Sequence, residues 1–337
     1  MNVLVTGGAG YIGSHVVLQL LAHDHRVVVI DDLSTGQKEL VDRRAHLVVG
    51  DVGDATKVAR VLDEHHIDAV LHFAGSIVVP ESIDHPLKYY LNNSAKTRTL
   101  LETCVANGVG QFVFSSTAAV YGEPEATPVS ESAPTTPINP YGRSKLITEW
   151  MLEDIANAYD LRFVALRYFN VAGADPQGRT GQATPNATHL LKVAAEAALG
   201  IRPGLEIFGT DYSTPDGTCI RDFIHVSDLA HIHVRALDFL ANGGSSQTLN
   251  CGYGRGFSVR QVVDAVQRVS GEDFPIKEGA RRVGDPPKII ADPSALQERF
   301  DWRPRFDDLD KIVATALAWE KTWRAGAVNR DMENAET

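Results

Sequence analysis

Short apolar runs alternate with amphipathic stretches through the first half of this 337-residue chain. The stretches at 11–22, 54–66, 93–108 and 141–159 read as helices that lie between several of these runs. Near-continuous apolar strands separated by helices are typical of a parallel sheet with both faces covered. The pattern therefore predicts a doubly wound α/β fold. The expected strands are 2–7, 27–31, 46–51, 69–75, 111–116 and 162–169.

The pattern changes after about Asp175, where Gly and Pro become frequent. Helical spacing of apolar residues recurs farther on, and this mixture predicts a smaller, loop-rich α/β lobe. We therefore expect residues 1–175 to form the doubly wound domain and 176–337 to form mainly the second lobe. Segments around 222–242 are expected to return to the first domain. The helical patterns of the second lobe lie at 188–199, 226–240, 258–270 and 309–324.

Composition and charge exclude several classes of protein. A net charge of −11 argues against general nucleic-acid binding, which usually needs a basic face, and means that an anionic substrate needs local cations. The sequence has no apolar run near the ~18 residues of a membrane span and no secretory leader pattern. The three scattered cysteines argue against a disulfide framework and favour a cytoplasmic location. No histidine pair has metal-ligand spacing with partners, so no metal is expected.

A glycine-rich turn follows the first strand and opens the first helix. Its sequence is Gly7-Gly8-Ala9-Gly10-Tyr11-Ile12-Gly13. Glycines at these positions let the backbone turn tightly and approach a pyrophosphate on the helix N-terminus. This context predicts a Rossmann-like dinucleotide site, against the alternative of a structural turn without ligand.

Carboxylates at the ends of the next strands indicate which dinucleotide binds. Asp31 is placed to accept hydrogen bonds from the adenosine ribose, and Asp31 and Asp32 together would repel a 2′-phosphate. NAD is therefore favoured over NADP. Asp51 follows the third strand, where it would either contact adenine or cap the next helix.

Tyr141 and Lys145 lie four residues apart and share one face if their segment is helical. An ammonium close to a phenol lowers the pKa of the tyrosine, which could then act as a general base. The spacing alone is common by chance, and an exposed polar helix face is the alternative. Phe73-Ala74-Gly75 and Thr117 end neighbouring strands, however, and ligands bind beyond such strand ends. The phenol, the ammonium and the Thr117 hydroxyl are therefore expected to converge on the cofactor.

The chain resembles the extended short-chain dehydrogenase/reductases and, within them, the nucleotide-sugar epimerases. The resemblance extends over nearly the whole chain, and its later motifs are the ones typical of the epimerases. The residues that carry it are 7–13, 72–75, 80–82, 89–93, 114–122, 141–145, 167–174, 207–212 and 221–226.

The resemblance implies NAD-dependent C4 epimerisation of UDP-glucose and UDP-galactose through a transient 4-keto sugar, as in galactose metabolism. Tyr141 would take the proton of the 4-hydroxyl, Thr117 would share its hydrogen bond, and Lys145 would bind the nicotinamide ribose. NAD would stay tightly bound and be regenerated in each turnover. The residues expected at the cofactor are Gly7, Gly10, Tyr11, Ile12, Gly13, Asp31, Asp32, Asp51, Val52, Phe73, Ala74, Gly75, Asn92, Tyr141, Lys145 and Phe169. Those expected at the UDP-sugar are Thr117, Tyr141, Asn170, His189, Leu190, Phe208, Arg221, Arg282, Asp285 and Ile289.

Three positions depart from the family pattern. Ile77 stands where a lysine near the nicotinamide phosphates is common, and His189 stands where an asparagine is common. Ile289 occupies a position that gates the sugar pocket, and its middle size leaves open whether N-acetylated sugars enter.

Alternative functions remain open. The substrate could be another UDP-sugar (UDP-xylose or arabinose, UDP-GlcNAc or GalNAc, or UDP-glucuronate), or the chain could be a catalytically silent NAD-binding protein. A dehydratase is disfavoured, because Thr117 is followed by Ala118-Ala119 rather than by an acid pair. The resemblance also suggests a homodimer built from helices 93–108 and 141–159.

Overall fold

The computed structural model describes residues 1–185, 187–282 and 285–335. A seven-stranded parallel sheet, in the order β10-β6-β5-β4-β1-β2-β3, forms its centre. The doubly wound α/β fold is confirmed, and so are the six predicted strands. The strands are β1 (Asn2–Thr6), β2 (Arg26–Asp31), β3 (His46–Val49), β4 (Ala69–His72), β5 (Gln111–Thr117), β6 (Arg162–Tyr168) and β10 (Gln247–Cys251).

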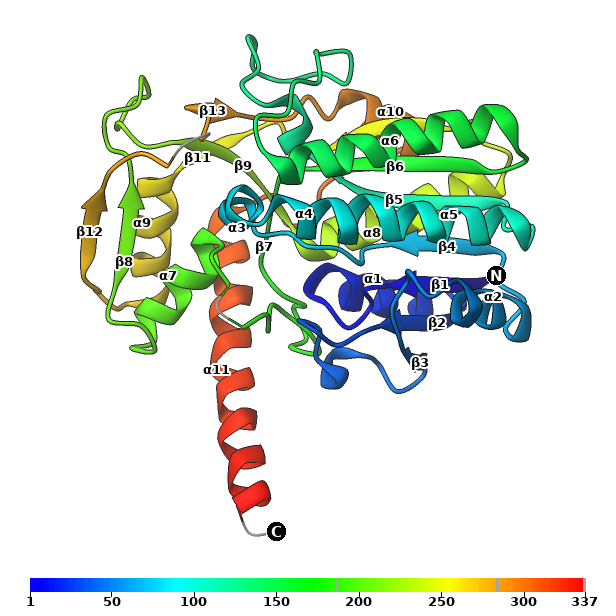
Figure 1. Cartoon of the computed structure of the whole chain (residues 1–337). Helices are drawn as coiled ribbons and strands as arrows, with labels where there is room; N and C mark the ends of the chain where they lie inside the picture. The colour runs from blue at the N-terminus through cyan, green and yellow to red at the C-terminus, as the bar shows by residue number, and fades with distance from the viewer. Residues whose placement is uncertain (186, 283–284, 336–337) are drawn as a thin grey trace.

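Side chains of the sheet alternate between two buried cores. Val3 and Val5 of β1 face one core, whereas Leu4 between them faces the other. The first core is covered by α1 (Tyr11–Ala22), α8 (Val226–Ala241) and α10 (Ser294–Phe300). The second is covered by α2 (Ala55–Glu64), α5 (Lys96–Ala106) and α6 (Pro140–Ala158), and Figure 1 shows α5 and α6 crossing the near face of the sheet.

The sheet reverses its strand order beside β1, which pairs with β2 on one side and with β4 on the other. Ligands of doubly wound sheets bind at the carboxyl ends of the strands at such a point. The Gly7 turn and the loop after β4 meet there, and a Cβ added to Gly7 would lie 2.6 Å from the backbone nitrogen of Ala74. The fold thus places the glycine turn at the edge where a ligand is expected.

The second lobe packs beside the carboxyl ends of the main sheet (Figure 1). It contains a four-stranded sheet of β7 (Asn170–Ala172), β9 (Ile220–His225), β11 (Gly256–Ser258) and β13 (Lys288–Ile289), and a pair formed by β8 (Leu205–Phe208) and β12 (Ile276–Gly279). Its core lies among α7 (Leu190–Ala198), α9 (Val259–Ser270) and α11 (Leu309–Ala335).

The chain passes between the two lobes more than once. Within the 222–242 segment, β9 belongs to the small sheet, whereas α8 packs against α1 in the first domain. The seventh strand of the main sheet is β10, which lies beyond that segment. Within the described ranges, no helix combines the length and apolar character needed to cross a membrane.

Candidate active site

The glycine turn leaves its backbone open to a ligand. Gly7 has a φ of +70°, a conformation that favours glycine, and a Cβ at Gly13 would lie 2.3 Å from the Gly7 carbonyl oxygen. Gly10 is the N-cap of α1 and provides no side-chain hydrogen bond to the first turn. The N-terminal amides of α1 therefore lack a capping side chain, as an anion-binding helix terminus requires.

Asp31 links this turn to the end of β2. Its carboxylate accepts hydrogen bonds from the backbone amides of Ala9 and Leu33, both at 2.9 Å. Burial raises the pKa of Asp31, and the two amide hydrogen bonds act in the opposite direction. Asp32 is exposed and accepts hydrogen bonds from Ser34. The Asp31 carboxylate thus lies beside the turn, whereas the Asp32 carboxylate contacts Ser34.

Asp51 and Val52 follow β3 at the same edge of the sheet. Asp51 pairs with Lys96 at 2.7 Å and accepts a hydrogen bond from the Gly53 amide at 2.8 Å. The helix that follows is capped by Asp54, so the capping interpretation of Asp51 is wrong. Val52 is buried in the core under α2.

The loop after β4 is held by Asn93, a residue that the sequence analysis missed. The Asn93 side chain accepts a hydrogen bond from the Ser76 amide at 2.7 Å and donates to the Ser144 hydroxyl at 3.0 Å. Its neighbour Asn92 donates to the Ser76 hydroxyl at 3.0 Å. The π-helical turn Tyr90–Ala95, which carries both asparagines, therefore joins the Phe73–Gly75 loop to α6.

Thr117, Tyr141 and Lys145 converge beyond the end of β5. Asn139 caps α6 by accepting a hydrogen bond from the Gly142 amide, which places Tyr141 in the first turn and Lys145 one turn later. The Thr117 hydroxyl hydrogen-bonds to the Tyr141 hydroxyl. Lys145 is only 3% exposed and donates to the Ser115 carbonyl at 2.9 Å. Its Nζ also lies 3.9 Å from the Cβ position of Gly75, at the cofactor edge.

The expected lowering of the pKa of Tyr141 by Lys145 does not occur in the protein chain alone. Burial raises the pKa of Tyr141, and the hydrogen bond with Thr117 offsets this only in part. Burial also lowers the pKa of Lys145 to about 8. The prediction was wrong because helical spacing says nothing about burial, which dominates both groups.

A buried ion pair fixes α6 to the sheet behind these three residues. Arg167 of β6 donates to both carboxylate oxygens of Glu149, at 3.0 and 2.7 Å, and the Ser116 hydroxyl donates to the same carboxylate. Glu149 lies one turn beyond Lys145, and Ser116 precedes Thr117. The sequence carried a signal for this pair, because an arginine inside an apolar strand needs a buried partner.

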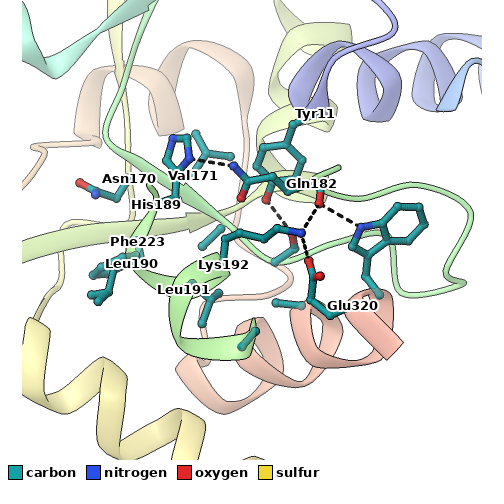
Figure 2. Close-up of a pocket in the computed structure, with 15 residues that line it drawn as sticks. Tyr11, Asn170, Val171, Gln182, His189, Leu190, Leu191, Lys192, Phe223 and Glu320 are labelled. Atoms are coloured by element: carbon teal, nitrogen blue, oxygen red, sulfur yellow. Dashed lines mark hydrogen bonds and ion pairs between the residues drawn. The ribbon is translucent and has the colours of Figure 1, made fainter. Parts of the chain in front are cut away.

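A small cavity of about 30 Å³ lies between the two lobes, and Figure 2 shows the residues around it. Asn170, His189 and Leu190, all expected at the UDP-sugar, line this cavity. Tyr11 reaches its wall from α1 and donates to the Gly173 carbonyl at 2.6 Å. The cavity therefore brings the glycine turn and part of the predicted substrate site together.

The remaining predicted substrate residues form a second group along β8, β9 and β13. Arg221 pairs with Asp285 at 3.4 Å, and the Arg282 guanidinium lies 3.9 Å from the centre of the Phe208 ring. Ile289 pairs in register with Arg221. Its side chain is buried in a cluster with Phe169 and Ala118. Ile289 thereby connects this group to the residues that follow Thr117.

Comparison with known proteins identifies the family. Residues 3–252 match the NAD dependent epimerase/dehydratase family. The chain belongs to this family. It is 60% identical to the UDP-glucose 4-epimerase of Azospirillum brasilense over 95% of this chain and 92% of that protein.

Two solved structures are similar to this chain over nearly its whole length. The UDP-glucose 4-epimerase from Brucella ovis in complex with NAD is 46% identical, with a TM-score of 0.91 over 94% of this chain and 97% of that one. The UDP-Glc/GlcNAc 4-epimerase from Campylobacter jejuni is 48% identical, with a TM-score of 0.83, and the match covers 95% of this chain and 99% of that one.

NAD is the cofactor of this epimerase/dehydratase chain, and the residues present fit it. The glycine turn has no room for a Cβ at Gly7 or Gly13 but leaves the first amides of α1 without a capping side chain. The described residues contain no cluster of His, Cys, Asp and Glu that could hold a metal ion.

Proposed function

We propose that the chain interconverts UDP-glucose and UDP-galactose by NAD-dependent epimerisation at C4, as a cytoplasmic enzyme of galactose metabolism. The observation that carries the proposal is the meeting of Thr117, Tyr141 and Lys145, with Lys145 beside Gly75 in the loop that packs against the glycine turn. Ala118-Ala119 follows Thr117, so the site has no acid pair there for eliminating water. The hydroxyls of Thr117 and Tyr141 and the ammonium of Lys145 suit a reversible oxidation of a sugar hydroxyl. The three free cysteines are all buried, which fits a reducing compartment.

Tyr141 exchanges the proton in the proposed reaction. Its hydroxyl and that of Thr117 form one hydrogen-bonded pair, so a sugar hydroxyl placed against them meets a proton acceptor and a second hydrogen-bonding group. NAD, when bound, supplies the hydride acceptor and the positive charge of the oxidised nicotinamide. Because burial raises the pKa of Tyr141 in the chain alone, we expect the phenol to become an efficient base only in the NAD-bound enzyme.

The nucleotide of the substrate would be bound by the second lobe. Arg221 and Arg282 are the expected partners of the diphosphate, which needs local cations in a chain of net charge −11. Arg282 stacks on Phe208 and Arg221 is held by Asp285, so each guanidinium is oriented in advance.

A panel of UDP-sugars tests the function. Purified protein, incubated without added NAD, should convert UDP-galactose to UDP-glucose, and the products are resolved by chromatography. The Tyr141→Phe variant should still bind UDP-sugar but lose orders of magnitude in turnover. If no C4 epimer forms from any sugar, even with NAD supplied, the proposal is refuted.

The same panel decides between substrates. The second candidate is an epimerase that also accepts UDP-GlcNAc, because the middle size of Ile289 leaves the entry of N-acetylated sugars open. Ile289 is packed against Phe169 and Ala118, at a position expected to limit the room for the sugar. Conversion of UDP-GlcNAc at a rate close to that of UDP-glucose would support the broader specificity.

We also propose that the chain forms a homodimer through α5 and α6, the helices expected from the sequence, together with the adjoining α3 (Val79–Asp84), α4 (Pro86–Tyr89) and π-helical turn. Three helical segments contact α6 there, and large apolar side chains remain exposed, with Leu87 80% exposed. The exposed apolar residues are Ile83, Leu87, Leu91 and Trp150. Such a concentration is typical of a protein interface.

Light scattering after size-exclusion chromatography measures the oligomer. The wild-type chain should have twice its 36.6 kDa monomer mass, and Leu87→Glu should shift it towards the monomer. Val49→Glu, at an exposed apolar residue of β3, is the matched control and should leave the mass unchanged. A wild-type monomer would contradict the proposal.

A further inference from the structure

Gln182 lies in the wall of the cavity and is held there by two hydrogen-bond donors (Figure 2). Its backbone carbonyl accepts from Lys192 Nζ at 3.0 Å and from Trp319 Nε1 at 3.2 Å. Lys192 is buried and also pairs with Glu320. Residues of α7 and α11 therefore hold the Gln182 backbone from two sides. The fixed backbone limits where the Gln182 side chain can reach.

The side-chain amide of Gln182 is directed at the His189 ring (Figure 2). Gln182 Nε2 lies 2.7 Å from His189 Nδ1. An amide NH₂ can only donate, so Nδ1 accepts and a neutral ring carries its proton on Nε2. The hydrogen bond thus makes the far nitrogen a donor.

His189 directly precedes α7, and its side chain is exposed beside Asn170 and Leu190 in the same cavity. We propose that Gln182 is a positioning residue: by fixing the Nε2-protonated tautomer, it makes His189 a hydrogen-bond donor to the diphosphate of the UDP-sugar. This inference rests on the proposed function, because it takes a UDP-sugar as the ligand. Diphosphate oxygens accept hydrogen bonds. In the Nδ1-protonated tautomer, the Nε2 lone pair of His189 would face these oxygens and repel them.

Gln182→Glu reverses the direction of the hydrogen bond with little change in shape. A carboxylate accepts, so the neutral ring would carry its proton on Nδ1 and lose the donor on Nε2. The added charge also raises the pKa of His189, and below that pKa the imidazolium donates from both nitrogens. The KM of this variant for UDP-galactose should therefore be close to the wild-type value near pH 6 and about tenfold or more higher near pH 9, with kcat changed much less.

Other titrating groups must be separated from this effect. Tyr11 of α1, Lys192 of α7 and Glu320 of α11 also line the cavity. They are the same in both proteins, so KM is compared as the ratio of variant to wild type at each pH. Gln177→Glu introduces the same charge on an exposed loop and should leave the ratio near one at every pH. A Gln182→Glu ratio that stays constant with pH would show a merely structural role and overturn the proposal.

The tautomer can be read directly by nitrogen NMR of protein with ¹⁵N-labelled histidine. His189→Asn identifies the His189 signals by their loss. In NAD-loaded wild type the proton should be on Nε2, and in Gln182→Glu at high pH it should be on Nδ1. A wild-type proton on Nδ1 would refute the inference. This measurement does not depend on turnover, so failure of the proposed epimerase activity in the wild type is distinguished from failure of the role of Gln182.

Discussion

The buried Glu149–Arg167 pair allows a sharp test of how the fold holds α6, the helix that carries Tyr141 and Lys145. Glu149 is 1% exposed and accepts three hydrogen bonds, two from Arg167 and one from Ser116. Glu149→Gln replaces the carboxylate with an amide of nearly the same shape. The NH₂ of that amide cannot accept, so part of the Arg167 guanidinium is left buried without its counter-charge.

The size of the effect follows from this burial. Removing one partner of a buried ion pair costs about 3–5 kcal/mol, because an uncompensated charge remains inside the protein. The Arg98–Glu102 pair on α5 provides the matched control, since both side chains are 62% exposed. Glu102→Gln should change the free energy of unfolding by no more than about 0.5 kcal/mol. The same substitution is thus made once in the interior and once in solvent.

Urea unfolding of both variants, followed by tryptophan fluorescence, measures the difference. The double variant Glu149→Leu/Arg167→Met should recover much of the lost stability, because apolar replacement of both partners is often nearly neutral. Since Glu149 shares α6 with Tyr141 and Lys145, we expect Glu149→Gln to lower kcat for UDP-galactose more than it changes KM. A loss of stability no larger than that of Glu102→Gln would refute the reasoning.

Two further predictions concern the cofactor edge. Burial lowers the pKa of Lys145 to about 8 from 10.5, so the unfolded chain binds more protons between these values and this lysine makes the free energy of unfolding rise with pH. Lys145→Met should remove that contribution in unfolding titrations of the NAD-free protein, while turnover falls; an unchanged pH dependence would contradict the assignment. Gly7→Ala should cost about 1–3 kcal/mol of stability, because a Cβ is strained at a positive φ and would lie 2.6 Å from Ala74 nitrogen. It should also weaken NAD binding, measured by calorimetry, whereas Gly108→Ala, which has a positive φ but open space, should not weaken it.

The strands of the main sheet could be predicted because their side chains alternate between two buried cores, as Val3, Leu4 and Val5 do. β10 was missed because its sequence, Gln247 to Cys251, has few apolar residues and no flanking pattern of its own. It becomes a strand by pairing with β6, which is a tertiary effect.

The site likewise has features that follow from local sequence pattern and features that depend on tertiary contacts. The convergence of Thr117, Tyr141 and Lys145 follows from helical spacing and strand ends, both of which are local rules. The role of Asn93 depends on Ser144, 51 residues away, and that of Glu149 depends on Arg167 in another element. No spacing rule reports such contacts. The pKa of Tyr141 was mispredicted for a related reason, since burial is a property of the whole fold.

The two halves of the site differ in how firmly the protein holds them. Lys145 and Thr117 are buried and hydrogen-bonded at the end of the main sheet, and Glu149 and Arg167 brace the helix behind them. His189 is instead exposed in the cavity between the lobes. Epimerisation through a keto sugar needs the redox groups to stay fixed while the sugar turns to present its other face. The rigid sheet edge meets the first requirement, and donors placed away from it can hold the nucleotide without restraining the sugar. We therefore expect substitutions at Glu149 to act mainly on kcat and those at Gln182 mainly on KM.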